Sequence, residues 1–258
     1  MGNELRLCKV PPIPLYYQLK EIIRQQIEDG IYKPGDAIPN ETELQEKYKL
    51  SRSTVRKAVE ELVADGLLIK RQGKGTFVQK PKITQNLNLI TSFGETLVAR
   101  GLTPKISNVE VEEIPAPAKI AQMLGLNVGD PVIHIFRLYL ADDDPIALMT
   151  NYLIPQLVPG LSREDLCKYS LYQILEHKYD LTLATADETM EARCADEYEA
   201  DMLNVVKGAP LLHVTRVTYS LDGSPIEVAI VTSRADRYSY SIKLSGREKS
   251  KRLIGISK

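Results

Sequence analysis

A short basic stretch between residues 50 and 78 carries the side chains best suited to binding an anionic polymer. It holds hydrogen-bond donors within about one turn of a predicted helix, followed by a basic turn: Arg52, Ser53, Thr54, Arg56, Lys74 and Gly75. Arginine presents a planar fork of donors that fits guanine O6 and N7 or phosphate oxygens. Serine and threonine hydroxyls also bind phosphate. The cluster therefore predicts a nucleic-acid contact, with a solvated charged face as the alternative.

The elements that must position these side chains are predicted from hydrophobic spacing. Apolar residues recur at helical spacing over residues 15–27. A second helix is expected to begin after Asn40, because Glu43 completes a capping-box pattern there. A third helix is expected after Ser51, with an apolar face over residues 55–62 that turns toward a core.

The segment that follows the third helix predicts two short strands around the turn at Lys74. Three helices and a β-hairpin, with a tight turn between helices two and three, are typical of a winged helix-turn-helix. The third helix of that fold enters the DNA major groove with its first residues nearest the bases. Arg52 and Arg56 would then reach bases or phosphates, while Lys74 and Gly75 would approach the minor groove or backbone.

Composition and motifs exclude several classes of protein. The chain has 258 residues, 26% of them charged and 43% hydrophobic, as is usual for a globular protein. The sequence contains no catalytic or nucleotide-binding signature, and its three cysteines lack metal-site spacing. No apolar run is long enough to span a membrane. We therefore expect a cytoplasmic protein without catalytic residues, metal, cofactor or membrane partner.

The middle of the chain contains an internal repeat with a constant offset of 79 residues. The matching pairs are Met123/Met202, Leu124/Leu203, Gly129/Gly208, Pro131/Pro210, His134/His213 and Arg137/Arg216. Each unit predicts a helix end, a strand, a turn and a second strand. Two such units imply one antiparallel sheet. The acidic run 142–144 lies in the first turn, where a solvated hairpin tip is favoured over a cation site.

Strand alternation places two charged residues among apolar neighbours. Arg137 shares a strand face with Ile135 and Tyr139, and Glu227 shares one with Ala229. A charge on such a face needs a partner. A structural ion pair and a bound ligand are both open possibilities, and the matching histidines of the repeat fall on the opposite face.

Residues 13–78 resemble the N-terminal domain of the GntR family of bacterial transcription regulators. The similarity includes "IPNETELQ", where the family has the pattern LPSE-x-ELA. Many members carry a DNA-contacting arginine where this chain has Thr42, so Thr42 is not expected to contact a base. The resemblance implies a winged helix-turn-helix that binds double-stranded operator DNA.

Residues 91–244 resemble the UTRA effector domain of the HutC-type branch of that family. The matching segments are "TSFGETLVARGLTP", "LLHVTRVTYSLDGSPIEVA" and "SRADRYSY". The resemblance implies a chorismate-lyase-like antiparallel sheet with helices, a homodimer, and a pocket for a small molecule. In relatives that bind phosphosugars, the matching pocket positions are Ser92, Phe93, Arg137, Tyr139, Ser170, Tyr172 and Glu227.

Two of these positions depart from the family pattern. Tyr139 replaces a second arginine, and Ser233 replaces a common tyrosine. Losing an arginine removes a bidentate donor for a dianion. The expected effector is a sugar phosphate or a related anion, and a less charged sugar or carboxylate is almost as well matched.

Together these observations predict an α+β protein that acts as a ligand-responsive transcription regulator, most simply a repressor. The expected organisation is a DNA-binding domain at 1–80, a linker at 81–90, an effector and dimerisation domain at 91–245, and a basic tail at 246–258. One alternative is a chorismate-lyase-like enzyme fused to a DNA-binding head. Another is a dimeric DNA-binding protein without an effector.

Overall fold

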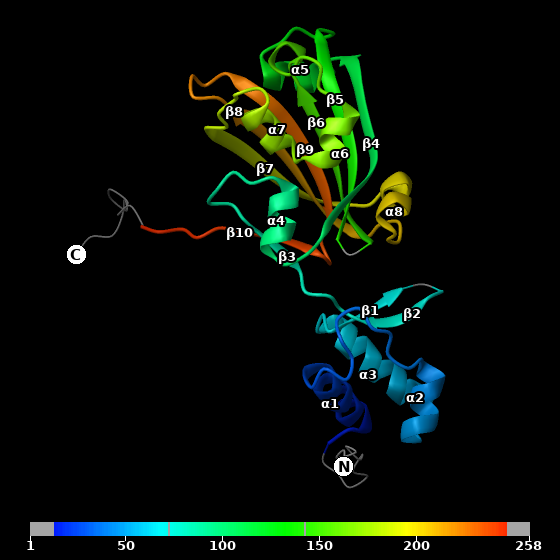
Figure 1. Ribbon diagram of the computed structural model, residues 1–258. Coiled ribbons are helices and arrows are strands. Elements are labelled where there is room, and N and C mark those ends of the chain that lie inside the picture. The colour runs from blue at the N-terminus through cyan, green and yellow to red at the C-terminus, as the bar shows by residue number, and fades with distance from the viewer. Residues whose placement is uncertain (1–12, 72, 142, 247–258) are drawn as a thin grey trace, which may run out of the picture. The chain divides into compact units, whose positions relative to one another are not determined.

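The computed structural model describes residues 13–71, 73–141 and 143–246, so most of the predicted basic tail and Asp142 lie outside the described residues. The chain folds as two compact units, residues 1–81 and 82–258, and each is described by itself (Figure 1). No helix among the described residues is long and apolar enough to cross a membrane.

The first unit contains three helices and a hairpin. These are α1 (Leu15–Glu28), α2 (Glu41–Tyr48), α3 (Arg52–Ala64), β1 (Leu68–Arg71) and β2 (Gly75–Val78). The buried faces of the helices and the hairpin form one core around Leu19, Val55 and Leu62. The predicted winged helix-turn-helix is confirmed.

Two side-chain caps start the second and third helices of this unit. The side chain of Asn40 accepts hydrogen bonds from the Thr42 and Glu43 amides, and the Glu43 carboxylate accepts one from the Asn40 amide. Ser51 accepts from the Thr54 amide at the start of α3. These caps satisfy amides that the first helical turn leaves unpaired, and they orient the beginning of α3.

The second unit is built on a six-stranded antiparallel sheet, as far as the described residues show, with the order β4-β5-β6-β9-β8-β7. The repeat accounts for this symmetric order, because each half contributes a strand, a helix and a hairpin. The first half is β4 (Pro104–Pro115), α5 (Ala118–Leu124), β5 (Pro131–Ala141) and β6 (Asp144–Leu153). The second half is β7 (Thr185–Cys194), α8 (Glu197–Leu203), β8 (Pro210–Tyr219) and β9 (Pro225–Arg234). The repeat is thus one strand longer at its start than the sequence predicted.

Helices cover both faces of this sheet. The helices α4 (Phe93–Ala99), α6 (Arg163–Lys168) and α7 (Leu171–His177) lie on one face, and the 3₁₀ turn η1 (Pro155–Leu157) follows β6 (Figure 1). The helices α5 and α8 pack on the other face, against side chains such as Val132 and Leu138. Arg137 shares its strand face with Ile135 and Tyr139, as strand alternation predicted, and the structure adds that α4 and α7 cover this face.

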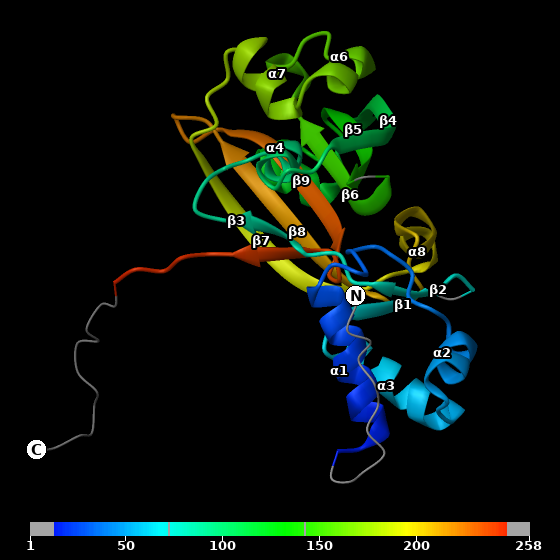
Figure 2. The same cartoon turned by 60° about the horizontal axis from the view of Figure 1, so that its bottom comes forward.

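A separate pair of strands joins the start of the second unit to its end. Strand β3 (Ile83–Asn86) runs parallel to β10 (Tyr238–Ser241), and the two lie side by side (Figure 2). The range 81–90, predicted as a linker, therefore contains a strand. Sequence periodicity could not show this, because the partner strand lies about 150 residues further along the chain.

Asp144 is not the solvated hairpin residue that was predicted. Its side chain is 9% exposed and accepts hydrogen bonds from Arg234 Nη1, at 3.0 Å, and from Arg237 Nη1. A buried carboxylate needs charged or hydrogen-bonding partners, and β9 and the turn after it supply two guanidinium groups. Asp144 therefore links the β5–β6 hairpin to the end of β9 and to the turn that follows it.

Candidate functional site

The start of α3 carries the first group of candidate residues on the surface of the first unit. Arg52, Ser53 and Arg56 are exposed, and Thr54 is half-buried. The Ser51 hydroxyl lies 3.0 Å from the Ser53 hydroxyl and 2.8 Å from that of Thr54. These short hydroxyls are therefore part of the capping network, whereas the two arginines extend beyond it.

Arg56 already has a partner on its own helix. Its Nε donates to Glu60 Oε1 at 2.7 Å, and this hydrogen bond holds the pKa of Glu60 below its usual range. The pair is exposed and weak because solvent screens it. A phosphate or base edge that approaches α3 can therefore replace Glu60.

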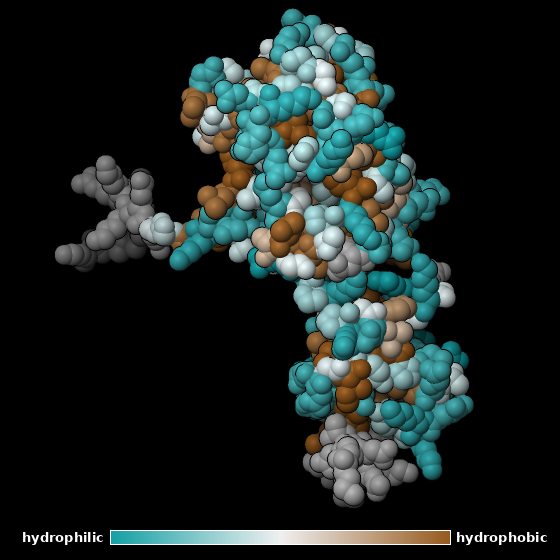
Figure 3. All heavy atoms as spheres, viewed as in Figure 1, coloured by the Kyte–Doolittle hydropathy of each residue, from teal (hydrophilic) through white to brown (hydrophobic). Residues whose placement is uncertain are grey.

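The hairpin supplies a second basic point. Lys74 is exposed in the turn between β1 and β2, and Gly73 and Gly75 on either side have φ angles of 69° and 119°. Both values fall in the region that favours glycine. Hydrophilic side chains cover the visible surface around the neighbouring helix α2 (Figure 3). The two basic elements and this polar surface form a candidate DNA-binding face of the first unit.

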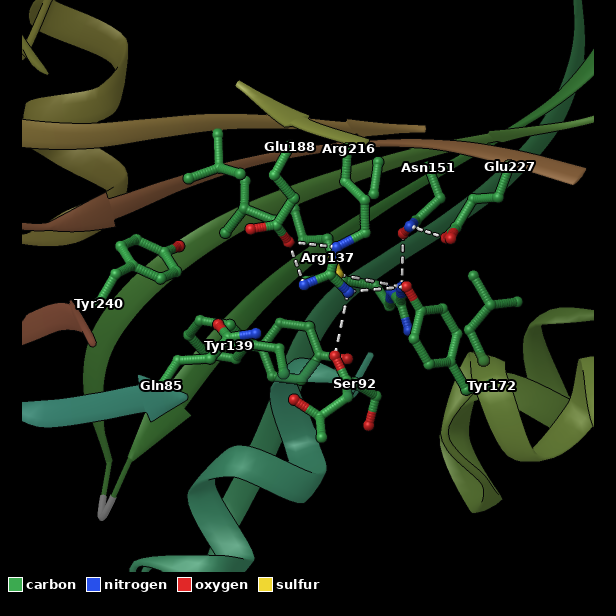
Figure 4. Close-up of a pocket in the computed structure, with 17 residues that line it drawn as sticks. Gln85, Ser92, Arg137, Tyr139, Asn151, Tyr172, Glu188, Arg216, Glu227 and Tyr240 are labelled. Atoms are coloured by element: carbon green, nitrogen blue, oxygen red, sulfur yellow. Dashed lines mark hydrogen bonds and ion pairs between the residues drawn. The ribbon is translucent and has the colours of Figure 1, made fainter. Parts of the chain in front are cut away.

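The second unit encloses a cavity of about 40 Å³ between the sheet and the elements that cover it (Figure 4). Its polar lining residues are Gln85, Thr91, Ser92, Arg137, Tyr139, Asn151, Tyr172, Glu188, Arg216, Glu227 and Tyr240. The volume admits only a few water-sized spheres. A larger ligand must displace some of these side chains to enter.

Arg137 lies in the wall of this cavity and is 1% exposed. Its Nη2 donates to Asn151 Oδ1 and to the Met149 sulfur, and its guanidinium carbon is 5.5 Å from the centre of the Tyr139 ring. Among the described residues, no group accepts a hydrogen bond from Nε or Nη1. Two donors of a buried cation are therefore available to an acceptor in the cavity.

Glu227 is fully buried near Arg137 but does not pair with it directly. It accepts hydrogen bonds from the Asn151 amide and from the Thr218 hydroxyl, the latter at 3.3 Å. Burial raises the pKa of Glu227 above its ordinary value. Asn151 thus bridges the two charges, so Arg137 and Glu227 do not form a direct ion pair with each other, and the bound ligand stays a prediction.

Arg216 is the second arginine in the cavity and was not predicted as a site residue. Its Nε and Nη2 donate to Glu188, and its Nη1 donates to the Tyr172 hydroxyl at 2.9 Å and to the Thr91 carbonyl at 3.1 Å. Burial and the hydrogen bond from Arg216 act in opposite directions on the pKa of Tyr172, and burial has the larger effect. Desolvation raises the pKa of Tyr172 strongly, which keeps its hydroxyl neutral.

The repeat could have identified Arg216, because it matches Arg137 at the same offset. Asn151 and Glu188 had no comparable pattern in the sequence. Gln85 and Tyr240 enter the cavity only through the pairing of β3 with β10.

Six of the seven predicted effector residues line the cavity: Ser92, Phe93, Arg137, Tyr139, Tyr172 and Glu227. Ser170 does not. Its hydroxyl accepts a hydrogen bond from the Gln173 amide at 3.2 Å and caps α7, beside a neighbouring groove of about 570 Å³. Val98 of α4 lines that groove as well, and its side chain is exposed. Tyr139 lines both spaces.

The described residues contain no group of three or more histidine, cysteine, aspartate or glutamate side chains that could hold a metal ion. The chemistry available in the cavity is hydrogen bonding and charge pairing by two guanidiniums, two carboxylates, hydroxyls and amides. Such a set recognises a polar small molecule.

Comparison with known families places both units. Residues 15–78 match the family of bacterial regulatory proteins called the gntR family, and residues 99–239 match the UTRA domain. The chain belongs to the gntR family. It is therefore a ligand-responsive, DNA-binding transcription regulator whose UTRA domain takes the effector, and the alternative of a fused enzyme is not supported.

The chain is also similar to individual proteins over most of their length. The chain is 36% identical to the HTH-type transcriptional repressor NagR of Bacillus subtilis (strain 168), over 92% of this chain and 97% of that protein. It is 30% identical to the histidine utilization repressor of Pseudomonas putida, over 92% of each. The crystal structure of PhnF from Mycobacterium smegmatis is similar with a TM-score of 0.62 and 28% identity, over 90% of this chain and all of that one.

Proposed function

We propose that this gntR-family regulator is a cytoplasmic repressor that binds its operator as a homodimer and responds to a small anion such as a sugar phosphate. The observation that carries the effector class is the buried guanidinium of Arg137, with two donors that no described residue satisfies. An unpaired buried charge is costly. An anionic group in the cavity would remove that cost and gain charge-assisted hydrogen bonds.

The chemistry around Arg137 supports an effector that is also polar at its other end. The Glu227 carboxylate can accept a hydrogen bond from a hydroxyl group, and the Asn151 side chain can accept or donate one. Tyr172 and Ser92 line the same cavity. Arg137, Tyr139, Ser92, Phe93, Tyr172 and Glu227 are the proposed effector contacts. The relatives named as repressors support negative control of transcription.

The proposed operator contacts are Arg52, Ser53, Thr54 and Arg56 on α3, with Lys74 and Gly75 on the hairpin. One helix-turn-helix reads too few base pairs for a specific site in a genome. A dimer that binds two symmetry-related half-sites doubles the contacts. Footprinting should show a twofold-symmetric site, and protection of one isolated half-site by a monomer would contradict the proposal.

A thermal-shift screen tests the effector class, because a ligand that binds only the folded state raises the melting temperature. The panel contains hexose 6-phosphates, the parent hexoses, small carboxylates and amino acids. Anions should stabilise the protein, and Arg137→Ala should remove that response. The control is Arg193→Ala, since Arg193 is an arginine of the same unit that pairs with the buried Glu199 and does not line the cavity. Stabilisation by neutral sugars alone would contradict an anionic effector.

A further inference from the structure

The two arginines that the repeat relates by its offset end at the same cavity. Arg137 comes from β5 in the first half of the sheet, and Arg216 comes from β8 in the second half. Their side chains extend toward the same central space beside Tyr172 (Figure 4). The positive charges of both arginines act on Glu227 and lower its pKa, against the larger upward effect of burial.

The two guanidiniums differ in how they are held. Arg137 has two unsatisfied donors, whereas each nitrogen of Arg216 donates to a partner. Only one of those partners, Glu188, carries a charge. An anion can therefore reach Arg137 directly, but it reaches Arg216 only by replacing one of these partners.

We propose that Arg216 supplies a second guanidinium for the effector's anionic group, and that this group replaces the carboxylate of Glu188 as its partner. The inference rests on the proposed anionic effector. It also explains how a chain with Tyr139 in place of a second arginine on β5 can neutralise a dianion. The second cation comes from the other half of the repeat.

The surroundings of Glu188 favour such an exchange. Glu188 lies on β7, an edge strand of the sheet, and its side chain is 15% exposed. Glu188 and Arg216 also line an open groove of about 450 Å³ on the surface. A displaced Glu188 carboxylate can turn into this groove and be hydrated, which avoids the cost of an unpaired buried charge. Glu227 has no such exit, because it is fully buried.

The ion pair between Arg216 and Glu188 therefore lies between the cavity and the surface groove. An uncharged sugar has nothing to offer Arg216 in exchange for a carboxylate. A phosphate monoester carries up to two charges and three acceptor oxygens, so it can pair with Arg137 and Arg216 together. The exchange selects dianionic effectors over neutral ones.

The test uses the full-length protein and measures dissociation constants by calorimetry with glucose 6-phosphate and inorganic phosphate, with glucose as the neutral probe. Glu188→Gln keeps the size and hydrogen bonding of the side chain but removes the competing charge. It should tighten binding of the phosphate probes by about tenfold, since the effector no longer competes with a charge-assisted bond. Arg216→Gln should weaken binding by about ten- to a hundredfold.

Two controls separate the exchange from a general change in charge or folding. Glu199→Gln neutralises another buried glutamate that pairs with an arginine, Arg193, outside the cavity, and it should leave binding unchanged. In the double variant Glu188→Gln/Arg216→Gln the gain should disappear. A gain of affinity in Glu188→Gln cannot arise from misfolding.

Each result decides the matter. Tighter binding in Glu188→Gln that depends on Arg216 supports the exchange. Phosphate binding by the wild type that Glu188→Gln leaves unchanged or weakens overturns the exchange but leaves an anionic effector in place. Failure of both phosphate probes to bind the wild type and Glu188→Gln overturns both proposals.

Discussion

The proposed operator contacts on α3 and the proposed effector cavity use arginine in opposite settings. Arg52 and Arg56 are exposed on α3, whereas Arg137 is 1% exposed and hydrogen-bonded to a buried asparagine. An exposed side chain contributes little to folding, so its removal should affect DNA binding alone. A buried guanidinium takes part in packing as well, so its removal should change both ligand binding and stability. Substitutions should therefore change function without stability in the first unit, whereas in the second unit they should change both.

The largest expected effect comes from removing Arg52 and Arg56, the two arginines proposed to contact the operator. If each reads a base, each substitution costs about 1–3 kcal/mol, so Arg52→Ala/Arg56→Ala should weaken specific operator binding at least thirtyfold or so. The melting temperature should stay close to that of the wild type. Fluorescence anisotropy with the operator and a scrambled duplex measures the loss. An equal loss on both duplexes would show that the arginines only contact phosphates.

Arg137→Ala should have the next largest effect, and it should act on two properties. A charge-assisted hydrogen bond is worth about 1.5–3 kcal/mol, so effector affinity should fall about ten- to a hundredfold. The melting temperature should change as well, because Asn151 and Glu227 lose a buried neighbour. Basal operator binding should survive. A variant with altered stability and normal effector response would show that Arg137 is purely structural.

Ser170→Ala sharpens the comparison within the second unit. Ser170 caps α7 and does not line the cavity, so its loss should cost about 1 kcal/mol of unfolding free energy, as N-cap losses typically do. Effector affinity should be unchanged. Denaturant unfolding and calorimetry on the same preparation measure both quantities. A tenfold loss of affinity would restore Ser170 to the effector site.

The smallest expected effect is on how the melting temperature depends on pH. The pKa of Glu227 is raised in the folded state, chiefly by burial. Its contribution to stability is therefore full below the unfolded pKa, and it is lost as pH rises through the folded pKa. Glu227→Gln does not titrate, so its melting temperature should fall less than that of the wild type between pH 5 and pH 8. Parallel curves for the two proteins would show that Glu227 does not ionise in this range.

The two regions also differed in how far sequence could predict them. The α3 surface depends on local features, since the caps at Asn40 and Ser51 and the apolar spacing of three helices are all contained in short segments. The antiparallel sheet followed from the repeat, and strand alternation placed Arg137 and Glu227 on the cavity face. The structure therefore confirms the two-domain α+β fold.

The rest of the cavity depends on which strands are neighbours. Asn151 meets Glu227 only because β6 pairs with β9, and Glu188 meets Arg216 only because β7 pairs with β8. Composition and periodicity within a strand carry no information about such pairing. For the same reason, the segment at 83–86 was predicted as linker, although its four residues form a strand with a distant partner.

The pairing of β3 with β10 also limits how far the DNA-binding unit can move from the effector unit. Between the end of β2 at Val78 and the start of β3 at Ile83 the chain can span at most roughly 18 Å when fully extended. If β3 separated from β10, the tether would run to Phe93 at the start of α4 and could reach roughly 54 Å when fully extended. A longer tether lowers the effective concentration of one DNA-binding unit near the half-site next to its partner's. Four residues of β-pairing thus set the length of free chain between the DNA-binding unit and the rest of the second unit.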